Sequence, residues 1–505
     1  MRILLLATLC LLLQSLLFSQ EARVLDSLVI IHWNDFHAQN IPFEVSSSSD
    51  RTAKRKVGGS AVMAGYLREF RKTSPNMLAV SGGDEFQGTP ISNFTSGRSQ
   101  VEILNVIKPD AVVLGNHEFD YGTDSLRANL KRAEYPIICS NVVETRDNST
   151  FGLPFVIKKL GNIKVGILGI TSPVLYALTL KKNLTGVRLR DLDSSLESSL
   201  SELKKQDHPN LIVLLSHEGV DDDSVLALRH PEINVIIGAH DHRALFNPKK
   251  IRNSIIVEAG SKGQYLGRLA LTVDLKGDSV TQFTDKLIEV TGEGIQPDSV
   301  VAAMVNANEV IVNKGLSEVI GELQTPWTKS DYGAYESNLG NYESDAFRTA
   351  SGIEADIAFV NTAGIRKNLA AGPIMVRDIW EINPFGNTIV SFTVRGDTLR
   401  QMMAWQAGKP SLQVSGVKYS FRKLDGPHAD LLSLEVDGKP VDDTKHYRIV
   451  TNNYVGEHFR TYFGFDPARV TITDTGLIDR DVVIDAVKRQ KVITSPIEGR
   501  IQSVN

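Results

Sequence analysis

The sequence predicts a layered α/β domain followed by a smaller α+β domain. From Leu28 to about residue 290, short apolar runs alternate with helix-like segments, which is the order of strands and covering helices in a layered domain. A second region begins near Ile320 and mixes strands and helices without that alternation. The chain has 505 residues, more than one hydrophobic core usually organises, so two domains are expected.

Six apolar runs of the first region have the length and β-branched content of buried strands. They are LVIIHW (28–33), MLAVSG (77–82), DAVVLG (110–115), KVGILGI (164–170), LIVLLS (211–216) and NVIIGA (234–239). Helices are expected over AVMAGYLREFRKT (61–73), SLRANLKRAE (125–134) and SSLESSLSELKKQ (194–206). The serine-rich segment 46–50 is expected to be a surface loop.

Few helix breakers interrupt residues 298–318, so one long helix is expected to join the two domains. Beyond it, NYESDAFRTA (341–350) predicts a helix, and IAFVN (357–361), TIVSFTV (388–394) and YRIVTNN (447–453) predict strands. Turn sequences AAGP (370–373) and NPFGN (383–387) separate them. The predicted boundaries are 26–297 for the first domain, 298–318 for the helix and 319–505 for the second domain.

The N-terminus has the layout of a secretory signal. Arg2 precedes a mostly apolar stretch, 3–18, which is short for a membrane span, and a polar SQEAR follows. We expect a signal peptide over 1–20 with cleavage near Ser19 or Gln20; a retained anchor is the alternative. Removing it leaves Cys139 as the one cysteine, so no disulfide can form within the mature chain, and Cys139 is expected to be buried.

Composition and charge are those of a soluble globular protein, and with the signal segment they lead us to expect a periplasmic or secreted protein that is soluble after signal cleavage. The hydrophobic share is 42% and the charged share 23%, both ordinary for a globular protein. The formal net charge of −4 gives no reason to expect a nucleic acid polymer or an anionic membrane as a partner. No later apolar stretch is long enough to span a bilayer.

Five of the apolar runs are each followed within a few residues by side chains that could bind a metal. These are Asp35 and His37; Asp84; Asn116, His117 and Asp120; His217; and His240 and His242. Ligands bind beyond the carboxyl ends of the strands in open α/β sheets, so the five runs are expected to converge. Residues two apart share a face of a strand, so Asp35 and His37 are expected to point the same way. Carboxylate, imidazole and amide oxygen ligands suit a pair of divalent cations bridged by one carboxylate.

Each of these side chains taken alone has an ordinary structural explanation. A single histidine on an apolar strand can be buried and hydrogen-bonded, Asp84 could cap a helix, Asp120 could be a turn residue, and Asn116 could be a left-handed residue after Gly115. Five of the chain's eleven histidines nevertheless fall at these strand ends. That grouping favours one shared site.

The ordered motifs NDFH, GGD, GNHEFD, SHEG and GAHDH resemble those of the calcineurin-like metallophosphoesterases. Within that group, the chain resembles the secreted or periplasmic 5'-nucleotidases, a family that includes UDP-sugar hydrolases and 2',3'-cyclic phosphodiesterases. The resemblance covers most of the mature chain. It implies a four-layer α/β/β/α sandwich for the first domain and a C-terminal α+β substrate-binding domain.

The same resemblance implies two divalent metal ions, which could be Zn, Mn, Co, Fe or Mg. One ion would be held by Asp35, His37, Asp84 and His242, and the other by Asp84, Asn116, His217 and His240, so that Asp84 bridges them. His117 would stabilise charge on the phosphate or protonate the leaving oxygen, and Asp120 would orient its ring. Glu118 is expected to be structural.

In the second domain, FVNTAGIR resembles the family's Asn-Gly-Gly-Gly-Ile-Arg element. NPFGN resembles the element whose phenylalanine stacks on a nucleobase, and TNNYVGE has a tyrosine at the place of the second stacking aromatic. The implied substrate-binding residues are Asn361, Gly364, Arg366, Phe385, Asn387 and Tyr454. The alternatives are a plain turn at PFGN and a core tyrosine at Tyr454.

Three departures from the family pattern concern substrate recognition rather than the metals. VGEHFRTYFGFD (455–466) replaces the usual Asn-Gly-Gly-Asp-Gly, whose aspartate binds ribose, and Glu457 or Asp466 could substitute for it. Thr362 and Ala363 replace glycines. KSDYGAYES (329–337) has no arginine where relatives usually have one.

These features favour an exported dinuclear phosphohydrolase that converts nucleoside 5'-monophosphates to nucleoside and phosphate. One alternative is a 2',3'-cyclic-nucleotide phosphodiesterase with 3'-nucleotidase action, or a hydrolase of a non-nucleoside phosphoester. An alternative of another class is an inactive metal-binding or ligand-binding module. Retention of both His117 and Asp120, which binding alone would not need, argues against that last alternative.

Overall fold

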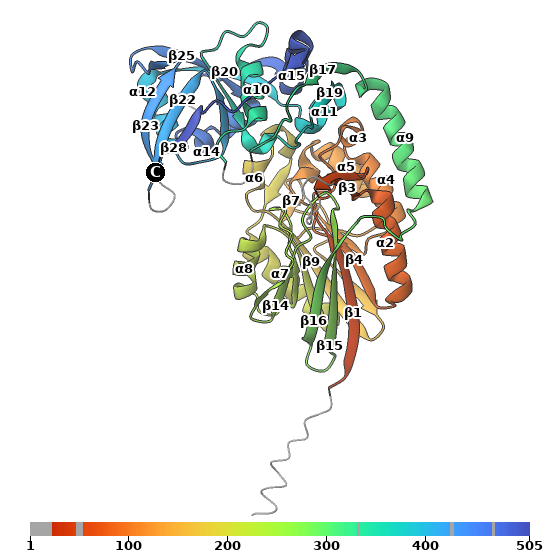
Figure 1. Cartoon of the computed structure of the whole chain (residues 1–505). Helices are drawn as coiled ribbons and strands as arrows, with labels where there is room; N and C mark the ends of the chain where they lie inside the picture. Colours follow the sequence, from red (N-terminus) through yellow and green to blue (C-terminus); the bar gives the residue numbers. More distant parts are fainter. Residues whose placement is uncertain (1–22, 47–53, 331–333, 425–428, 467–469, 505) are drawn as a thin grey trace, which may run out of the picture.

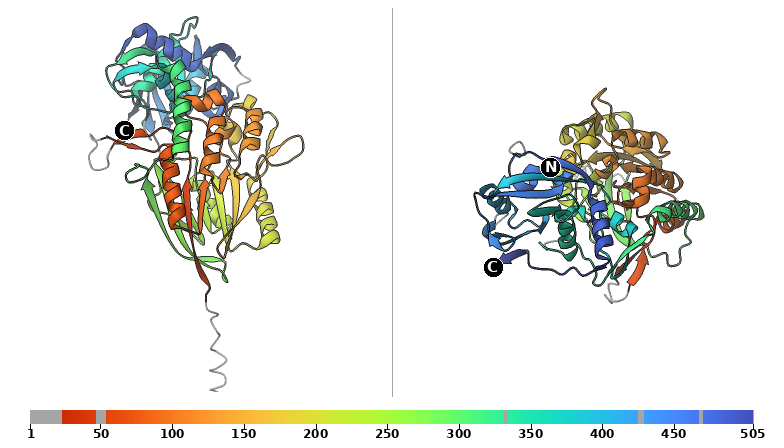
Figure 2. Two further views of the ribbon diagram at one scale, coloured as in Figure 1. Left: turned by 90° about the vertical axis from the view of Figure 1, so that its right-hand side faces the viewer. Right: turned by 90° about the horizontal axis from the view of Figure 1, so that it is seen from above.

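The computed structural model describes residues 23–46, 54–330, 334–424, 429–466 and 470–504. The expected signal segment, 1–20, lies outside the described residues, and so does most of the serine-rich segment. Two lobes are stacked, with helix α9 between them in the sequence and along one side in space (Figures 1 and 2). No helix among the described residues is both long enough and apolar enough to cross a membrane.

The first lobe is built on two six-stranded sheets. One has the strand order β16 (Ser279–Glu289), β15 (Tyr265–Asp274), β1 (Leu25–Trp33), β4 (Met77–Ser81), β5 (Ala111–Val113) and β6 (Ile137–Ile138). The other has the order β13 (Lys249–Ile251), β14 (Ser254–Val257), β12 (Val235–Ile237), β11 (Leu211–His217), β9 (Ile163–Thr171) and β8 (Phe155–Leu160). Two further antiparallel strand pairs are β2 (Phe43–Ser46) with β3 (Lys54–Val57) and β7 (Val142–Glu144) with β10 (Val187–Leu189).

The two sheets pack face to face and helices cover both outer faces. Ile30 of β1 lies in the core between the sheets with Val213 of β11, whereas the next residue, Ile31, lies in the core under the helices, as the two-residue period of a strand requires. The first sheet is covered by α2 (Ser60–Thr73), α4 (Arg98–Ile107) and α5 (Thr123–Arg132), and the second by α7 (Leu192–Asp207) and α8 (Val220–Arg229). The expected four-layer α/β/β/α order is confirmed.

Parallel pairing brings the candidate ligands to one edge. β1, β4, β5 and β6 run parallel, and so do β9, β11, β12 and β14. Their carboxyl ends therefore lie at one end of the lobe, next to the short helices α3 (Pro90–Thr95), η1 (His117–Phe119), α6 (Leu175–Leu178) and η2 (Lys181–Leu184). The second lobe covers this end (Figure 1).

Helix α9 (Ser299–Leu316) belongs to both hydrophobic cores. Asp298 caps it by accepting hydrogen bonds from the amides of Val300 and Val301. Near its start Val301 is buried in the core of the first lobe, and one residue near its end, Val312, is buried in the core of the second. The helix thus fixes the spacing of the two lobes along its length.

The second lobe is an α+β domain. Its five-stranded sheet has the order β21 (Leu412–Ser415), β18 (Ile357–Asn361), β25 (His446–Asn452), β20 (Thr388–Arg395) and β26 (Thr473–Ile478). A four-stranded sheet has the order β24 (Lys439–Pro440), β23 (Ala429–Val436), β22 (Val417–Lys423) and β28 (Ile501–Val504). A three-stranded sheet has the order β19 (Gly372–Met375), β17 (Val319–Leu323) and β27 (Val492–Ile493). The helices are α10 (Asn338–Arg348), η3 (Thr362–Gly364), α11 (Val376–Ile382), α12 (Gly396–Gln406), α13 (Asn453–Glu457), α14 (Phe459–Phe463) and α15 (Asp479–Gln490).

Candidate metal centre

Most of the candidate ligands lie in left-handed turns after the strands; the exceptions are His217, the last residue of β11, and Asn116. Strand β1 ends at Trp33, and Asp35 and His37 beyond it have φ of 49° and 52°. The two side chains do point to one cluster, as expected, but left-handed turns place them there and not alternation on a strand. Asp84, with φ of 55°, His240 with 85° and His242 with 60° are in the same sparsely populated region. Each such residue costs on the order of 1–3 kcal/mol and is typical of a functional site.

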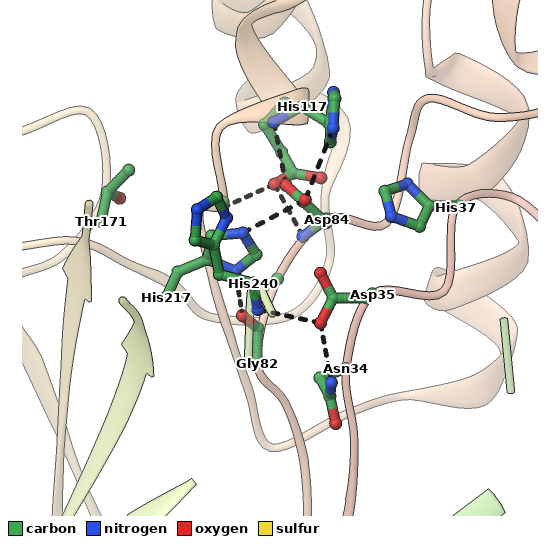
Figure 3. A network of polar contacts seen from close by, with 12 residues as sticks. Asn34, Asp35, His37, Gly82, Asp84, His117, Thr171, His217 and His240 are labelled. Atoms are coloured by element: carbon green, nitrogen blue, oxygen red, sulfur yellow. Dashed lines mark hydrogen bonds and ion pairs between the residues drawn. The ribbon is translucent and has the colours of Figure 1, made fainter. Parts of the chain in front are cut away.

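The turns bring the side chains into three overlapping clusters. In each cluster one donor atom per residue lies within 4.8 Å of the others. The clusters are Asp35, His37 and His242; His37, Asp84 and His117; and Asp84, His217 and His240. Asp84 lies at the centre of the group (Figure 3), with its Oδ2 3.1 Å from His217 Nε2.

The donor set fits a pair of cations. Asp35 Oδ1, Asn116 Oδ1 and His217 Nε2 are buried and have no hydrogen-bond partner among the described residues. The Nδ1 of His37 donates to the carbonyl oxygen of Gln87 at 2.8 Å, and the Nδ1 of His217 donates to that of Gly82 at 2.7 Å. These bonds leave each Nε2 facing the cluster, where the neutral ring would offer its lone pair to a metal ion.

The charge states of His37, His240 and Asp84 suit metal binding, whereas His217 would first have to release a proton. Burial, helped by Arg366 and His242, holds the pKa of His37 well below its usual value. Burial and His217 lower the pKa of His240 to about 4. Burial alone would raise the pKa of Asp84, but His217 and His117 outweigh it and hold this pKa well below its usual value. Neutral imidazoles and an ionised carboxylate are the forms that bind cations. Against the effect of burial, the Asp84 carboxylate raises the pKa of His217 to about 10, so His217 is protonated without a metal and would release that proton when a cation binds.

His117 and Asp120 form a close pair beside the cluster. His117 is the first residue of the 3-10 turn η1 and Asp120 directly follows the turn, so that His117 Nδ1 lies 2.6 Å from Asp120 Oδ2. Burial would lower the pKa of His117, but Asp84 and Asp120 outweigh it, so this pKa is raised. His117 is therefore held by one ring nitrogen while the other, Nε2, faces Asp84 at 3.9 Å.

The alternative explanations that the sequence offered for Asp84 and Asn116, a helix cap and a left-handed residue, are wrong. Asp84 caps no helix, because the next one is α3, whose N-cap is Thr89. Asn116 is not left-handed, since its φ of −75° and ψ of −29° are right-handed helical values. Cys139 is buried, as expected.

Glu118 organises the loops that carry the ligands. Its carboxylate accepts hydrogen bonds from four backbone amides, those of Asp84 at 3.0 Å, Glu85 at 2.7 Å, Phe86 at 3.3 Å and Gly115 at 2.6 Å. One side chain thereby ties the loop after β4 to the loop after β5. Glu118 therefore has a structural role, as expected: it holds the two ligand loops together.

The second lobe completes a cavity of about 450 Å³ over the cluster. Arg366 reaches in with Nη2 3.4 Å from His37 Nε2. The Phe385 ring lies 5.8 Å from the His117 ring and 5.8 Å from the Arg366 guanidinium. All six residues expected to bind substrate line this cavity: Asn361, Gly364, Arg366, Phe385, Asn387 and Tyr454.

Tyr454 is a cavity residue rather than a core residue. Its side chain is half-buried, and its hydroxyl donates to the carbonyl oxygen of Ala177 in the first lobe at 2.9 Å. Neither acid suggested as a substitute for the missing aspartate lines the cavity. Glu457 instead accepts a hydrogen bond from the amide of Lys181 at 2.9 Å, and Asp466 lies away from the cavity lining.

Five further polar residues line the cavity without any motif that could have marked them in the sequence. They are Gln87, Asn93, Tyr121, Asn183 and Arg480. Asn93 donates to the carbonyl oxygen of Pro384 at 2.7 Å and so links the two lobes, and Asn183 donates to the carbonyl oxygen of Asp120 at 2.7 Å. Their positions depend on tertiary contacts, which no local pattern records.

Comparison with known proteins agrees with this geometry. The calcineurin-like phosphoesterase model matches residues 28–244, and the 5'-nucleotidase C-terminal domain model matches residues 319–465. A 5'-nucleotidase precursor from Thermus thermophilus has a crystal structure that superposes with a TM-score of 0.85 at 28% identity, covering 95% of this chain and 100% of that one. A snake venom 5'-nucleotidase of Naja atra is 26% identical over 525 residues, covering 94% of this chain and 98% of the relative.

Another relative is much longer. Endonuclease YhcR of Bacillus subtilis (strain 168) is 25% identical over 502 residues, and the match covers 94% of this chain but 40% of that protein.

The two family models cover both lobes in order, and the phosphoesterase fold uses a dinuclear divalent metal centre, which the clusters around Asp84 suit. The chain belongs to the 5'-nucleotidase family of calcineurin-like phosphoesterases.

Proposed function

We propose that this metal-dependent phosphohydrolase, which acts on nucleotides, removes the phosphate from nucleoside 5'-monophosphates outside the cytoplasm. One observation supports the proposal above the others. The metal-binding cluster, the His117–Asp120 pair and two residues of the second lobe, Arg366 and Phe385, line the same cavity. A cavity of about 450 Å³ has the size of a small-ligand site.

The proposed ligand sets follow the clusters. Asp35, His37, Asp84 and His242 would hold one divalent cation, and Asp84, Asn116, His217 and His240 the other. When bound, such a pair of cations activates a water and neutralises charge on the phosphoryl oxygens.

The protein's own side chains would do the rest. The guanidinium of Arg366 would bind two phosphoryl oxygens with its fork of donors. As the ester bond to the nucleoside breaks, His117 Nε2 would give its proton to the leaving oxygen, with Asp120 holding the ring in place through Nδ1. Phe385 and Tyr454 would hold the base by stacking.

Export and the domain division are part of the proposal. The apolar stretch 3–18 after Arg2 has the layout of a signal segment, and a related 5'-nucleotidase is a snake venom protein. We place the first domain at 26–297, the joining helix at 298–318 and the substrate-binding domain at 319–505. N-terminal sequencing of the mature protein tests the export proposal, since it should begin near residue 20.

A substrate panel tests the reaction. The protein reconstituted with Mn²⁺, Zn²⁺, Co²⁺ or Mg²⁺ should hydrolyse 5'-monophosphates with a higher kcat/KM than 2',3'-cyclic nucleotides and bis(p-nitrophenyl) phosphate. Denatured DNA belongs in the panel because one relative is named an endonuclease. A preference for the cyclic or polymeric substrates would overturn the proposal, as would hydrolysis that resists chelators.

A further inference from the structure

An arginine of the second lobe lies in the cavity wall without a carboxylate partner among the described residues. Arg480 is the second residue of α15, and its Cζ lies 3.7 Å from the ring centroid of Trp380. Within the same described part of the chain, its Nε is buried and has no hydrogen-bond partner. The carboxylate of the preceding Asp479 instead accepts a hydrogen bond from the Arg480 backbone amide at 2.7 Å. The guanidinium is held in place by stacking on the indole, and its unused N–H donors are available to bind a ligand.

Arg480 lies at the end of the cavity away from the metal-binding cluster. A Cβ on Gly386 would come within 2.9 Å of Arg480 Nη1, so the guanidinium lies against the turn that carries Phe385. Arg366, in contrast, lies 3.4 Å from His37. The charges that act on Arg480 are those of Asp479, Asp481 and Tyr121, none of which belongs to the cluster.

The position of Arg480 determines which part of a nucleotide it can reach. A nucleotide whose phosphate lies at Arg366 and the cluster would place its base against the Phe385 ring, next to the turn that Arg480 contacts. The turn at Gly386 continues to Asn387, which also lines the cavity. The edge of the base would therefore face the free donors of Arg480.

We propose that Arg480 binds the edge of the nucleobase and makes the site prefer 6-oxopurines, the bases of GMP and IMP, over adenine. This inference rests on the proposed nucleotidase function. Arginine only donates hydrogen bonds, and its fork matches the O6 and N7 acceptors of a 6-oxopurine. Adenine presents an amino donor in place of O6, so two donors would face each other.

IMP and AMP are a matched pair for the test, because their main difference is the group at position 6. In the metal-reconstituted protein, kcat/KM for IMP should exceed that for AMP by about 5-fold to about 150-fold, the range for one bidentate contact. Arg480→Gln should abolish or reverse this ratio, mainly through KM, because glutamine matches the N6 and N7 of adenine. Arg480→Lys should lower the ratio partly, because lysine keeps the charge but loses the fork.

The control is Arg400→Gln, which changes an exposed arginine of α12 that pairs with Asp443 and should leave the IMP to AMP ratio unchanged. The ratio is measured within one preparation, so it does not depend on the fraction of folded or metal-loaded protein. A ratio near one in the unmodified protein, or a ratio that neither Arg480 variant alters, overturns the inference while nucleotide hydrolysis persists. Turnover of p-nitrophenyl phosphate without hydrolysis of any nucleotide overturns the proposed function and the inference with it.

Discussion

The Nε2 atoms of His37 and His242 lie 3.1 Å apart. The two histidines come from loops after β1 and β12, and the Nδ1 of His37 is already bonded to the Gln87 carbonyl. His242 Nε2 also lies 3.3 Å from Asp35 Oδ1, which has no hydrogen-bond partner among the described residues. Two imidazole nitrogens and a carboxylate oxygen at this spacing suit a shared cation, and the first prediction tests this.

Removal of His242 should cost the protein one of its two metal ions. His242→Ala deletes one of three clustered donors and leaves the cluster of Asp84, His217 and His240 intact. Elemental analysis after reconstitution should give about two ions per chain for the unmodified protein and about one for His242→Ala. His446→Ala, at an exposed histidine of β25, is the control and should keep both ions. Two ions in His242→Ala would contradict this ligand set.

Chelation should lower the unfolding temperature. A ligand that binds only the folded state stabilises it by about 2.7 kcal/mol when its free concentration is 100 times its Kd. The metal-free protein should therefore melt earlier than the reconstituted protein, and added metal should restore the original melting temperature. Differential scanning calorimetry with and without a chelator measures the difference, and coincident transitions would count against a structural contribution of the metals.

His117→Ala should lower kcat by about 10²–10⁴ without loss of metal, because His117 is held by Asp120 and supplies a proton rather than a ligand. The measurement pairs kcat for a 5'-monophosphate with elemental analysis of the same sample. Since His117 also lies in a cluster with His37 and Asp84, the alternative is that it binds a metal. A joint loss of activity and one metal ion would support that alternative.

The sequence was sufficient to predict which residues meet, because parallel strands bring their carboxyl ends to one edge whatever the details of the loops. It was insufficient to predict how they meet. Asp35 and His37 are held in left-handed conformations by backbone hydrogen bonds to Gly83 and Asp84, from a loop some fifty residues away. No pattern within the NDFH motif contains that information.

The second lobe shows the same limit more strongly. Arg366 and Phe385 could be predicted because each lies in a recognisable motif. Arg480 could not, because its stacking partner Trp380 and the turn at Gly386 lie about 100 residues before it in the sequence. A lone arginine near a helix start is usually a solvated surface residue, and tertiary packing alone makes this one part of the cavity.

Glu118→Gln should destabilise the protein by roughly 2–5 kcal/mol. The carboxyl group accepts four backbone hydrogen bonds, which favour its ionised form, while burial and Asp84 raise its pKa to about 8. Each bond contributes about 0.5–1.5 kcal/mol, although not additively. Glutamine has one acceptor oxygen, and its amide hydrogens would face backbone donors. Because the loops of Asp84 and Asn116 would loosen, metal affinity should also fall by about 10- to 100-fold.

Urea denaturation of the metal-free proteins measures the stability, and a metal titration measures the affinity. The control is Glu44→Gln, which changes an exposed glutamate that pairs with Lys54 on the hairpin β2–β3 and should have no measurable effect on either. If Glu118→Gln were as stable as the control, the four hydrogen bonds could not be what holds the two loops together.

Glu343 should make the stability of the protein fall as pH rises from about 4.5 to about 8. This glutamate of α10 is fully buried, with Oε1 accepting a hydrogen bond from Asn383 at 3.0 Å and Oε2 without a partner among the described residues. Burial raises its pKa from the usual 4.5 to about 8, against the opposing effect of Asn383 and with a further increase from Asp479.

The sign follows from the raised pKa. Below about pH 4.5 both the folded and the unfolded state keep the proton, so the full stability is present. Between about pH 4.5 and 8 unfolding releases it, and the free energy of unfolding falls by at most about 1.4 kcal/mol per pH unit. Glu343→Gln mimics the protonated form and removes this dependence, so its stability advantage over the unmodified protein should grow from pH 5 to pH 8. Denaturation curves of the metal-free proteins at several pH values measure the difference, with Glu322→Gln, at an exposed glutamate, as the control. If the free energies of unfolding of Glu343→Gln and the unmodified protein changed equally with pH, Glu343 would already be ionised in the folded state.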